Sequence, residues 1–402
     1  MTTQNLPKIL GALLLGACST TALQAAAADT DQATFADALK SGKVAVSLRY
    51  RLESVDQDNL DDTALASTLK SRINWTSGTY RGFGAFIEMD DVTAVGDDDY
   101  NSTVNGNVEY PVVADPEGTE VNQAYIQYRG DNSVVTAGRQ RINLDGQRFV
   151  GGVGWRQNEQ TYDGYRYQYG AAKGLQLDYS YVYNVNRIFG EDSGKSDLEG
   201  DIQLFHATYP VAEGHKVSGF LYELDLDNAV NASSRTIGVD YKGAFGPVKA
   251  HLSYANQTET GDSALDYSVP YYLAEVGSAI GPVNAKLGYE VLGADNGTGF
   301  ATPLATLHKY QGFTDKFLAT PGDGVEDLYV GGSMKVGGGK LGVTYHTFTA
   351  SESSADYGSE IDISYGRKLT DGLTGVIKYA SYSADDYSVD TDKVWLMLTA
   401  SF

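Results

Sequence analysis

The sequence predicts an all-β chain, folded as a single transmembrane antiparallel β-barrel of about eighteen strands. Three observations lead to this prediction. Apolar and polar residues alternate in short segments, short and long connections alternate along the chain, and no window after the N-terminus is apolar enough for a spanning helix. Of 402 residues, 46 are glycine, 29 tyrosine and only 9 proline, a balance typical of many strands, tight turns and aromatic belts.

The first residues have the pattern of an export signal. Lys8 gives a weak positive flank, residues 9–17 form an apolar core, and residues 25–28 offer small side chains for cleavage. We therefore expect export to the periplasm and then insertion into the outer membrane of a bacterial cell. The expected division of the chain is a signal peptide over residues 1–28, a periplasmic lead-in segment over residues 29–42 and the barrel over residues 43–402.

Cys18 is the only cysteine, so no intrachain disulfide can form. Residues 15–18 also resemble a lipoprotein processing box, in which Cys18 would be acylated and become the first residue. Two routes of leader processing therefore stay open.

The strand candidates begin at Lys43, where apolar side chains take one face and charged side chains the other. The same alternation returns over residues 69–75, 83–90, 175–184 and 283–291. A soluble β-sandwich could also alternate in this way, so the period alone does not decide between the two folds.

The connections favour the membrane barrel, because short turns separate longer polar loops, as in outer-membrane barrels of the porin type. About eighteen strands, an even number, would place both termini in the periplasm. The chain stops on Phe402, which shares a face with four apolar residues before it and resembles the C-terminal signature of such barrels; an ordinary apolar strand is the alternative. The short turns are expected at residues 77–82, 130–133, 170–174, 243–247, 281–282, 337–340 and 370–372.

Two stretches depart from the strand pattern. Phe35, Ala36 and Leu39 have helical spacing, which predicts a short periplasmic helix or a disordered lead-in before the first strand. In the longest loop, residues 293–323, Pro303 after a threonine predicts a helix start. A loop of this length either folds inward and narrows the lumen or caps the outer rim.

The formal charge is −22, from 52 acidic and 30 basic residues, which argues against nucleic-acid binding. The acidic runs fall mostly in the longer loops, which would face the cell exterior. They are either solvated loops or sites where divalent cations tie the loops to lipopolysaccharide. Outer-membrane lipid, lipopolysaccharide and a small hydrophilic or anionic saccharide solute are the expected partners.

Charged residues also take the inward face of the first strands. Opposite charges across a narrow aqueous path orient and select ions, but the same residues can instead satisfy one another across neighbouring strands. Further basic residues follow, although the strand face near Arg139 is ambiguous because Val135 and Ala137 share it. An anion-favouring constriction would result if several converge. The candidate pore-lining residues are Arg49, Arg51, Lys70, Arg72, Glu88, Arg139, Arg141, Arg148, Arg156, Asp163 and Arg166.

Within residues 120–170 the chain resembles a known family. The matching residues are Gly138, Arg139 and Gln140, residues 147–151, Trp155, and residues 161–166. They resemble the alginate-export family of outer-membrane proteins, whose members are monomeric eighteen-stranded barrels and whose type member conducts an anionic polyuronate through an arginine-lined pore. The resemblance implies a similar fold, favours a monomer, and assigns the motif's basic residues to Arg139, Arg148 and Arg166 and its acid to Asp163.

An enzyme is the competing class. His251 and Ser253 lie two apart on one strand, as in a barrel lipase, but they would point into the lumen, and the sequence names no third partner to orient the histidine. The five histidines lack metal-ligand spacing, so no metal site and no cofactor are expected. The sequence therefore predicts a passive channel for small hydrophilic solutes or oligosaccharides, with export of an anionic polysaccharide as the alternative.

Overall fold

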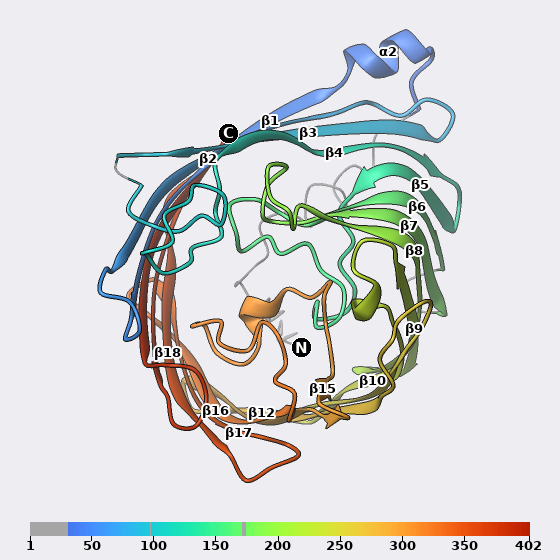
Figure 1. The fold of residues 1–402 in the computed structure, drawn as a ribbon. Helices are drawn as coiled ribbons and strands as arrows, with labels where there is room; N and C mark the ends of the chain where they lie inside the picture. Colours follow the sequence, from blue (N-terminus) through green and yellow to red (C-terminus); the bar gives the residue numbers. More distant parts are fainter. Residues whose placement is uncertain (1–30, 97, 171–173) are drawn as a thin grey trace, which may run out of the picture.

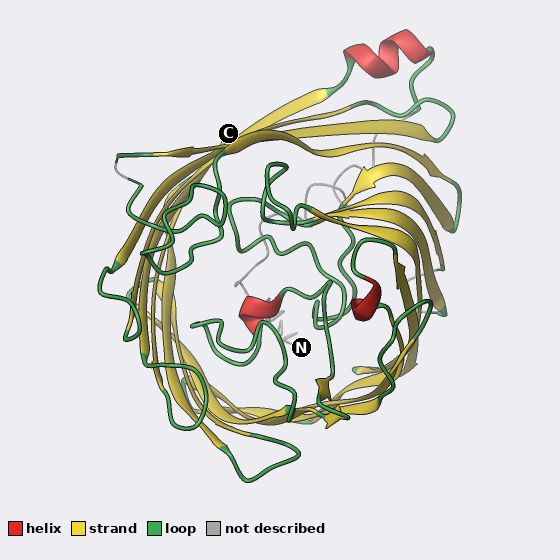
Figure 2. Ribbon diagram, in the orientation of Figure 1, coloured by secondary structure: helices red, strands yellow, loops and turns green. Residues whose placement is uncertain are grey.

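The computed structural model describes residues 31–96, 98–170 and 174–402, so the expected signal peptide and Cys18 lie outside the described residues. Eighteen antiparallel strands form one sheet that closes on itself, as Figures 1 and 2 show in a view along the barrel. The first strand, β1 (Lys43–Gln57), pairs with both β2 (Ala64–Thr76) and the last strand, β20 (Thr391–Ser401). This confirms the predicted fold class.

Each of the remaining barrel strands pairs in antiparallel fashion with the barrel strands that precede and follow it in the chain. A two-residue pair, β14 (Ala294–Asp295) with β15 (Thr298–Gly299), forms a separate hairpin, and the helical elements are α2 (Phe35–Lys40), η2 (Val230–Ala232) and η3 (Leu307–Lys309). The remaining barrel strands are β3 (Phe83–Ala94), β4 (Gly118–Arg129), β5 (Ser133–Gln140), β6 (Thr161–Tyr169), β7 (Gln176–Asn186), β8 (Asp197–Ala212), β9 (His215–Leu226), β10 (Ser234–Phe245), β11 (Val248–Glu259), β12 (Ser268–Ile280), β13 (Val283–Leu292), β16 (Val325–Val336), β17 (Gly339–Thr349), β18 (Asp356–Thr370) and β19 (Leu373–Ser383).

The side chains alternate between the two faces of the wall, as the sequence pattern requires. On β1, Val44 and Val46 are exposed on the outer face, while Arg51 and Glu53 are fully buried on the inner face. On β20, Val394 and Leu396 are exposed outside and Trp395 is buried inside. No helix in the described part of the chain is long and apolar enough to cross a membrane.

Two long connections turn into the barrel, where Figure 1 shows them crossing its interior. They are loop L3 (residues 141–160, between β5 and β6) and loop L7 (residues 293–324, between β13 and β16). The two loops touch through a bridge between Val150 and Leu304. L7 therefore takes the inward course, and its helix is a single short turn, η3, that begins four residues after the predicted start at Pro303.

An apolar core lies between these loops and one side of the wall. Phe149 of L3 packs its ring against Phe220 of β9, Tyr271 of β12 and Phe300 of L7. Inward side chains of β7 and β8, such as Val182 and Ile202, are completely buried in the same core. The interior of the barrel is therefore packed where L3 and L7 meet this side of the wall, and the packing holds the two loops in place.

Candidate functional site in the barrel lumen

The inner face of β1, β2 and β3 carries the charges that the alternation predicts. Arg49 lies opposite Lys70 in the strand register, and Arg72 lies opposite Asp90. Arg72 donates two hydrogen bonds to Asp90, from Nε at 2.6 Å and from Nη2 at 2.5 Å. Five predicted residues, Arg49, Arg51, Lys70, Arg72 and Glu88, therefore share one stretch of wall.

Loop L3 covers this stretch and neutralises most of its charges, while Arg49 donates to the uncharged Gln157 side chain of L3 at 2.9 Å. Glu159 of L3 lies 3.2 Å from the Lys70 ammonium and 2.9 Å from the Arg72 guanidinium, and it also pairs with Arg141. Arg141 reaches Glu88 at 3.0 Å. Burial alone would raise the pKa of Glu159, but Arg141, Arg72 and Lys70 hold that pKa well below its usual range. The carboxylate therefore stays charged and holds L3 on the wall.

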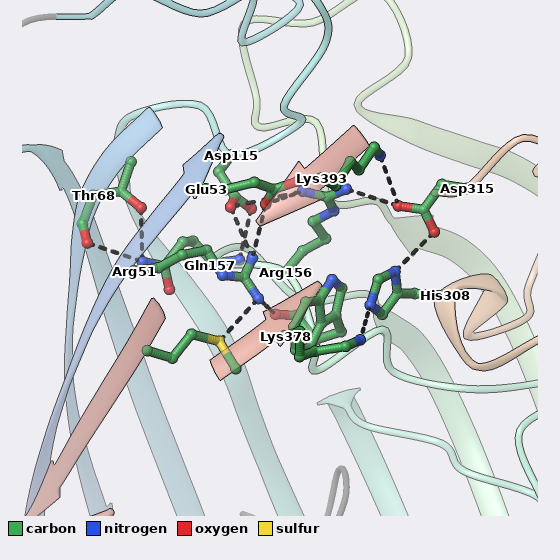
Figure 3. Close-up of polar contacts among 12 residues, drawn as sticks. Arg51, Glu53, Thr68, Asp115, Arg156, Gln157, His308, Asp315, Lys378 and Lys393 are labelled. Atoms are coloured by element: carbon green, nitrogen blue, oxygen red, sulfur yellow. Dashed lines mark hydrogen bonds and ion pairs between the residues drawn. The ribbon is translucent and has the colours of Figure 1, made fainter. Parts of the chain in front are cut away.

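A second set of pairs continues the network, and Figure 3 shows it in close-up. Arg51 donates to Asp115 of the connection between β3 and β4 at 2.9 Å, and its guanidinium lies 4.3 Å from the Trp155 ring centroid. Arg156 of L3 donates to Glu53 at 3.0 Å and to Asp315 of L7 at 3.2 Å. Both arginines are buried.

His308 ties L7 to the same wall. Its Nδ1 lies 2.8 Å from an Asp315 oxygen, and the Lys378 ammonium of β19 donates to its Nε2 at 2.5 Å. The ring stacks on Trp155 at 4.2 Å between centroids. Because Lys378 must donate, the imidazole is neutral with its proton on Nδ1. Burial, together with the charge of Lys378, lowers the pKa of His308 to about 3 although Asp315 opposes the shift.

Arg148 of L3 joins both L7 and strand β13, on a different part of the wall from His308. It donates to Glu290 of β13 at 2.6 Å and to the Gln311 amide of L7 at 3.2 Å. Its guanidinium also lies 4.7 Å from the Tyr310 ring centroid. We call the buried charged residues of β13, β16–β20 and β1–β3, with their partners in L3 and L7, the fastened wall.

The structure does not bring Arg139 and Asp163 to the lumen. Arg139 shares the outward face with Val135, and the inward residues of β5 are Thr136 and Gln140. Its Nε donates to Asp163 at 2.8 Å on that outer face. Strand parity therefore separates this pair from the other predicted residues.

Arg166 of β6 does face inward. Its Nη2 lies 2.5 Å from the Asp178 carboxylate of β7, which also accepts a hydrogen bond from Gln168. Arg166 is thus a lumen residue, but it stands apart from the fastened wall.

Seven further lysines on the inward face are absent from the predicted pore-lining set, which contains Lys70 as its one lysine. Each stands close to a short turn, and together we call them the lysine track. They are Lys216 of β9, Lys242 of β10, Lys249 of β11, Lys286 of β13, Lys335 of β16, Lys340 of β17 and Lys368 of β18. Their position at inward parity was the signal that could have found them.

The lysine track differs from the fastened wall in exposure and pairing. The side chains of Lys216 and Lys286 are 44% and 43% exposed. Lys216 lies opposite Lys242, and Lys335 lies opposite Lys340, so like charges face one another on neighbouring strands. Within the described residues, Lys249, Lys335 and Lys340 make no ion pair.

Some carboxylates lie near the track without neutralising all of it. Asp145 of L3 lies 4.0 Å from Lys216 and 2.7 Å from His206 Nε2. Burial alone would raise the pKa of Asp145, but the hydrogen bond with His206 lowers it to about 2. Asp240 lies 3.1 Å from Lys242 and also pairs with His251. The track keeps an excess of positive charge.

His251 and Ser253 both point into the lumen, as the alternation predicted. His251 is paired with Asp240, while the Ser253 hydroxyl donates to the Val239 carbonyl at 3.3 Å. The hydroxyl is therefore not presented to the histidine as a nucleophile would be. Across the described ranges, no group of three or more histidine, cysteine, aspartate or glutamate residues is placed to hold a metal ion.

Comparison with known proteins identifies related sequences and folds. The alginate export family matches residues 41–255, more than half of the chain. The solved structure of the outer membrane protein OpdK from Pseudomonas aeruginosa has a TM-score of 0.72 at 15% identity, covering 90% of this chain and 99% of that chain. The same organism's OccD3 (OpdP) has a TM-score of 0.71 at 14% identity, covering 93% and 94%.

A third similar structure is OccAB4 from Acinetobacter baumannii, with a TM-score of 0.70 at 13% identity, covering 93% of this chain and 99% of that chain. No curated protein matches the sequence. At these identities the likeness is one of fold, and the fold is that of an outer-membrane β-barrel.

Proposed function

This chain belongs to the alginate export family, and from that premise we propose that it is an outer-membrane channel for passive passage of small hydrophilic anions and acidic oligosaccharides. The observation that carries the proposal is the lysine track. On a chain with a net charge of −22, seven lysines gather on the inner face of the barrel, and three of them have no acidic partner among the described residues. The family and the fold are not those of an enzyme, as the sequence predicted.

Exposed ammonium groups in a water-filled lumen attract anions, because the low-dielectric wall concentrates their field along the path. The fastened wall contributes little to this attraction. Arg51, Arg72 and Arg156 are buried within hydrogen-bond distance of carboxylates, so their charges are compensated locally. Arg49 has no carboxylate of the described residues within this distance and donates to the Gln157 amide oxygen and to the Gly154 carbonyl of L3 instead. We therefore propose that the lysine track, rather than the arginines of β1 and β2, sets the charge preference, and that L3 and L7 set the width.

Export of an anionic polysaccharide is the second candidate function. Two observations favour it: the family match, and the position of the lysine track beside the short turns. Outer-membrane barrels place their short turns in the periplasm, where a polymer leaving the cell would enter. Residues such as Lys249 and Lys340 would meet its carboxylates first.

Several further assignments belong to this proposal. The lipid-facing wall is in contact with outer-membrane lipid and the acidic outer loops with lipopolysaccharide, and the chain acts as a monomer. Residues 1–28 act as the signal peptide, and residues 29–42 as the lead-in. Mass spectrometry of the mature N-terminus tests the last point, because cleavage after Ala28 and acylation of Cys18 leave chains of different mass.

Planar-bilayer conductance of the refolded protein is the direct test. With a salt gradient, the reversal potential is expected to show a preference for chloride over potassium. Added oligouronates are expected to reduce the stepwise conductance, more strongly from the short-turn side. A cation preference, or the absence of stepwise conductance, would refute the channel proposed here. Indifference to oligouronates together with anion preference would refute the polysaccharide candidate alone.

A further inference from the structure

The short helix α2 lies outside the barrel with an apolar face that nothing in the described chain covers. Figure 1 shows it beside the wall, next to the ends of β1 and β3. Phe35 is 64% exposed and Leu39 is 41% exposed, whereas Ala38 on the opposite side is buried. A six-residue helix is marginal by itself in water, so its surroundings must hold it.

The helix is built into its position. Thr34 caps its N-terminus by accepting a hydrogen bond from the Asp37 amide, and the Gly78 amide of the turn between β2 and β3 donates to the Ala38 carbonyl at 2.8 Å. A side chain at Gly42 would overlap the Trp75 indole, and one at Gly78 would lie within 2.2 Å of the Ser41 hydroxyl. These close approaches fix which face of α2 points away from the barrel.

Aromatic, basic and acidic residues surround the exposed face. The two carboxylates, Asp31 and Asp37, accept hydrogen bonds from the Gly82 amide and from the Thr34 hydroxyl. The Phe35 ring lies 6.4 Å from the Tyr80 ring, and the Arg81 guanidinium lies 5.3 Å from the Tyr80 centroid. The rings of Phe83 and Tyr128, on the outer face of β3 and β4, pack against each other in a tilted arrangement with centroids 4.9 Å apart, and both are exposed. Aromatic side chains at this level are where barrels meet the membrane interface.

The lipid-facing wall continues from this collar without a break. Ile73 of β2 is 50% exposed and Ile126 of β4 is 60% exposed on the same outer face. Lys40 and Arg81 are exposed beside it and can extend their charges to headgroups while their carbon chains stay in the apolar layer. The apolar outer wall, the aromatic residues at its edge and the two nearby cations are together the features by which a protein surface binds an anionic phospholipid layer.

We propose that α2 and the turn 77–82 form an interfacial anchor that binds anionic phospholipid of the periplasmic leaflet. Phe35 and Leu39 enter the boundary between headgroups and acyl chains, and Lys40 and Arg81 bind the phosphate groups. The anchor holds the first strand at the level of the interface, next to the seam where β1 meets β20.

Spin-label depth measurements test the anchor in the full chain, in vesicles of phosphatidylethanolamine with phosphatidylglycerol. A Cys18→Ser background allows single nitroxides at Phe35→Cys and, separately, Leu39→Cys. Ile126→Cys is the lipid-facing control, and Val108→Cys, on an exposed loop valine, is the water-facing control. Labels on α2 are expected to collide more with dissolved oxygen than with a water-soluble nickel chelate, as at position 126. Collision ratios like those at position 108, at both α2 positions, would overturn the anchor.

The headgroup contribution has its own measurement. In Lys40→Ser with Arg81→Ser, the label at Leu39→Cys is expected to lose its dependence on phosphatidylglycerol while a label at Ile126→Cys is unchanged. If phosphatidylglycerol and phosphatidylcholine vesicles give the same depth in the unmodified chain, the assignment of an anionic headgroup is wrong. Channel conductance is not the readout, so this test and the test of the proposed function fail independently.

Discussion

The fastened wall and the lysine track lie on the inner face of the same barrel, yet they have opposite electrostatic states. Arg51 and Glu53 in the fastened wall are fully buried, with partners within hydrogen-bond distance. Lys216 and Lys286 in the track are more than two-fifths exposed, and their nearest acidic atoms are 4.0 and 3.7 Å away. The first arrangement stabilises loops, while the second leaves charge available to a solute.

The comparison shows that inward parity alone does not assign a role to a charged residue. Parity puts Arg72 and Lys242 on the same face of the wall. What separates them is the source of the partner: Glu159 of loop L3 pairs with Arg72, whereas the ion pair of Lys242 is with Asp240 on its own strand. An inward charged residue that forms a buried ion pair with a loop holds that loop on the wall, and its charge is no longer available to select solutes.

The largest expected effect comes from breaking the fastened wall at Glu159. Glu159→Gln removes the charge that three buried cations share, namely Lys70, Arg72 and Arg141. Removing one partner of a buried ion pair costs about 3 to 5 kcal/mol. We expect L3 to leave the wall, which would raise single-channel conductance and make L3 sensitive to protease.

Glu191→Gln is the matched control, because Glu191 lies exposed in an outer loop and the change in charge is the same. It is expected to leave both conductance and protease sensitivity unchanged. Equal conductance in the Glu159→Gln and Glu191→Gln variants would show that L3 does not depend on this network.

The next largest effect concerns the lysine track. Replacing Lys216, Lys242 and Lys286 by Ser removes three inward, partly exposed charges, whose nearest carboxylate oxygens lie 4.0, 3.1 and 3.7 Å away. Lumen substitutions tune selectivity more than stability, and exposed pairs of this kind contribute about 1 kcal/mol or less. The anion preference, measured as reversal potential in a salt gradient, is expected to fall several-fold while heat stability stays constant.

Lys195→Ser is the control for this variant, since Lys195 is exposed in the loop between β7 and β8. Its reversal potential should equal that of the unmodified channel. If the triple variant also keeps the original reversal potential, the selectivity must come from another part of the lumen.

Lowering the pH is expected to weaken the fastened wall at His308. The pKa of His308 falls from 6.5 to about 3 through burial and the charge of Lys378, so the folded loop favours the neutral imidazole. Because the folded pKa is below the unfolded one, the stability that His308 contributes is complete above pH 6.5 and is lost as pH falls toward 3. Burial alone would raise the pKa of Asp315, but Lys393, Arg156 and the contact with His308 hold it below its usual value, so Asp315 loses its charge only at still lower pH.

L7 should therefore loosen between pH 6.5 and 3. Trp155 stacks on His308, so acrylamide quenching of tryptophan fluorescence reports this change. Quenching is expected to increase as pH falls through this window, and the increase should be absent in His308→Gln. A flat profile in the unmodified protein would mean that His308 does not hold L7.

Much of the fold could be predicted from the sequence, because every strand of an outer-membrane barrel alternates apolar residues facing lipid with polar residues facing the lumen. Val44, Val46 and Arg51 follow this alternation, and its interruptions give the strand number and the short turns. The inward course of L3 could not be read, since it depends on contacts between distant residues such as Arg49 and Gln157. The sequence therefore located most of the wall's charges but not the loop that neutralises them.

Arg139 shows how the local rule becomes ambiguous at the end of a short strand. β5 has eight residues, and its last inward position, Gln140, follows Arg139 directly. A shift of one residue moves a side chain to the other face of a sheet. The resemblance to the alginate-export motif suggested the lumen for Arg139, whereas its shared face with Val135 required the outside.

The smallest expected effect follows from that outward position. Replacing Arg139 by Gln and Asp163 by Asn together removes an ion pair whose atoms lie 2.8 Å apart on the outer face, with the arginine side chain 28% exposed. Because both charges disappear at once, neither partner is left unpaired, and the cost should stay near or below about 1 kcal/mol. Reversal potential and conductance are expected to equal those of the unmodified channel, in contrast to the lysine-track variant. A changed reversal potential would mean that permeating ions sense Arg139 although it lies on the outer face. In that case, the face of the wall on which a charge lies would not decide whether it contributes to ion selectivity.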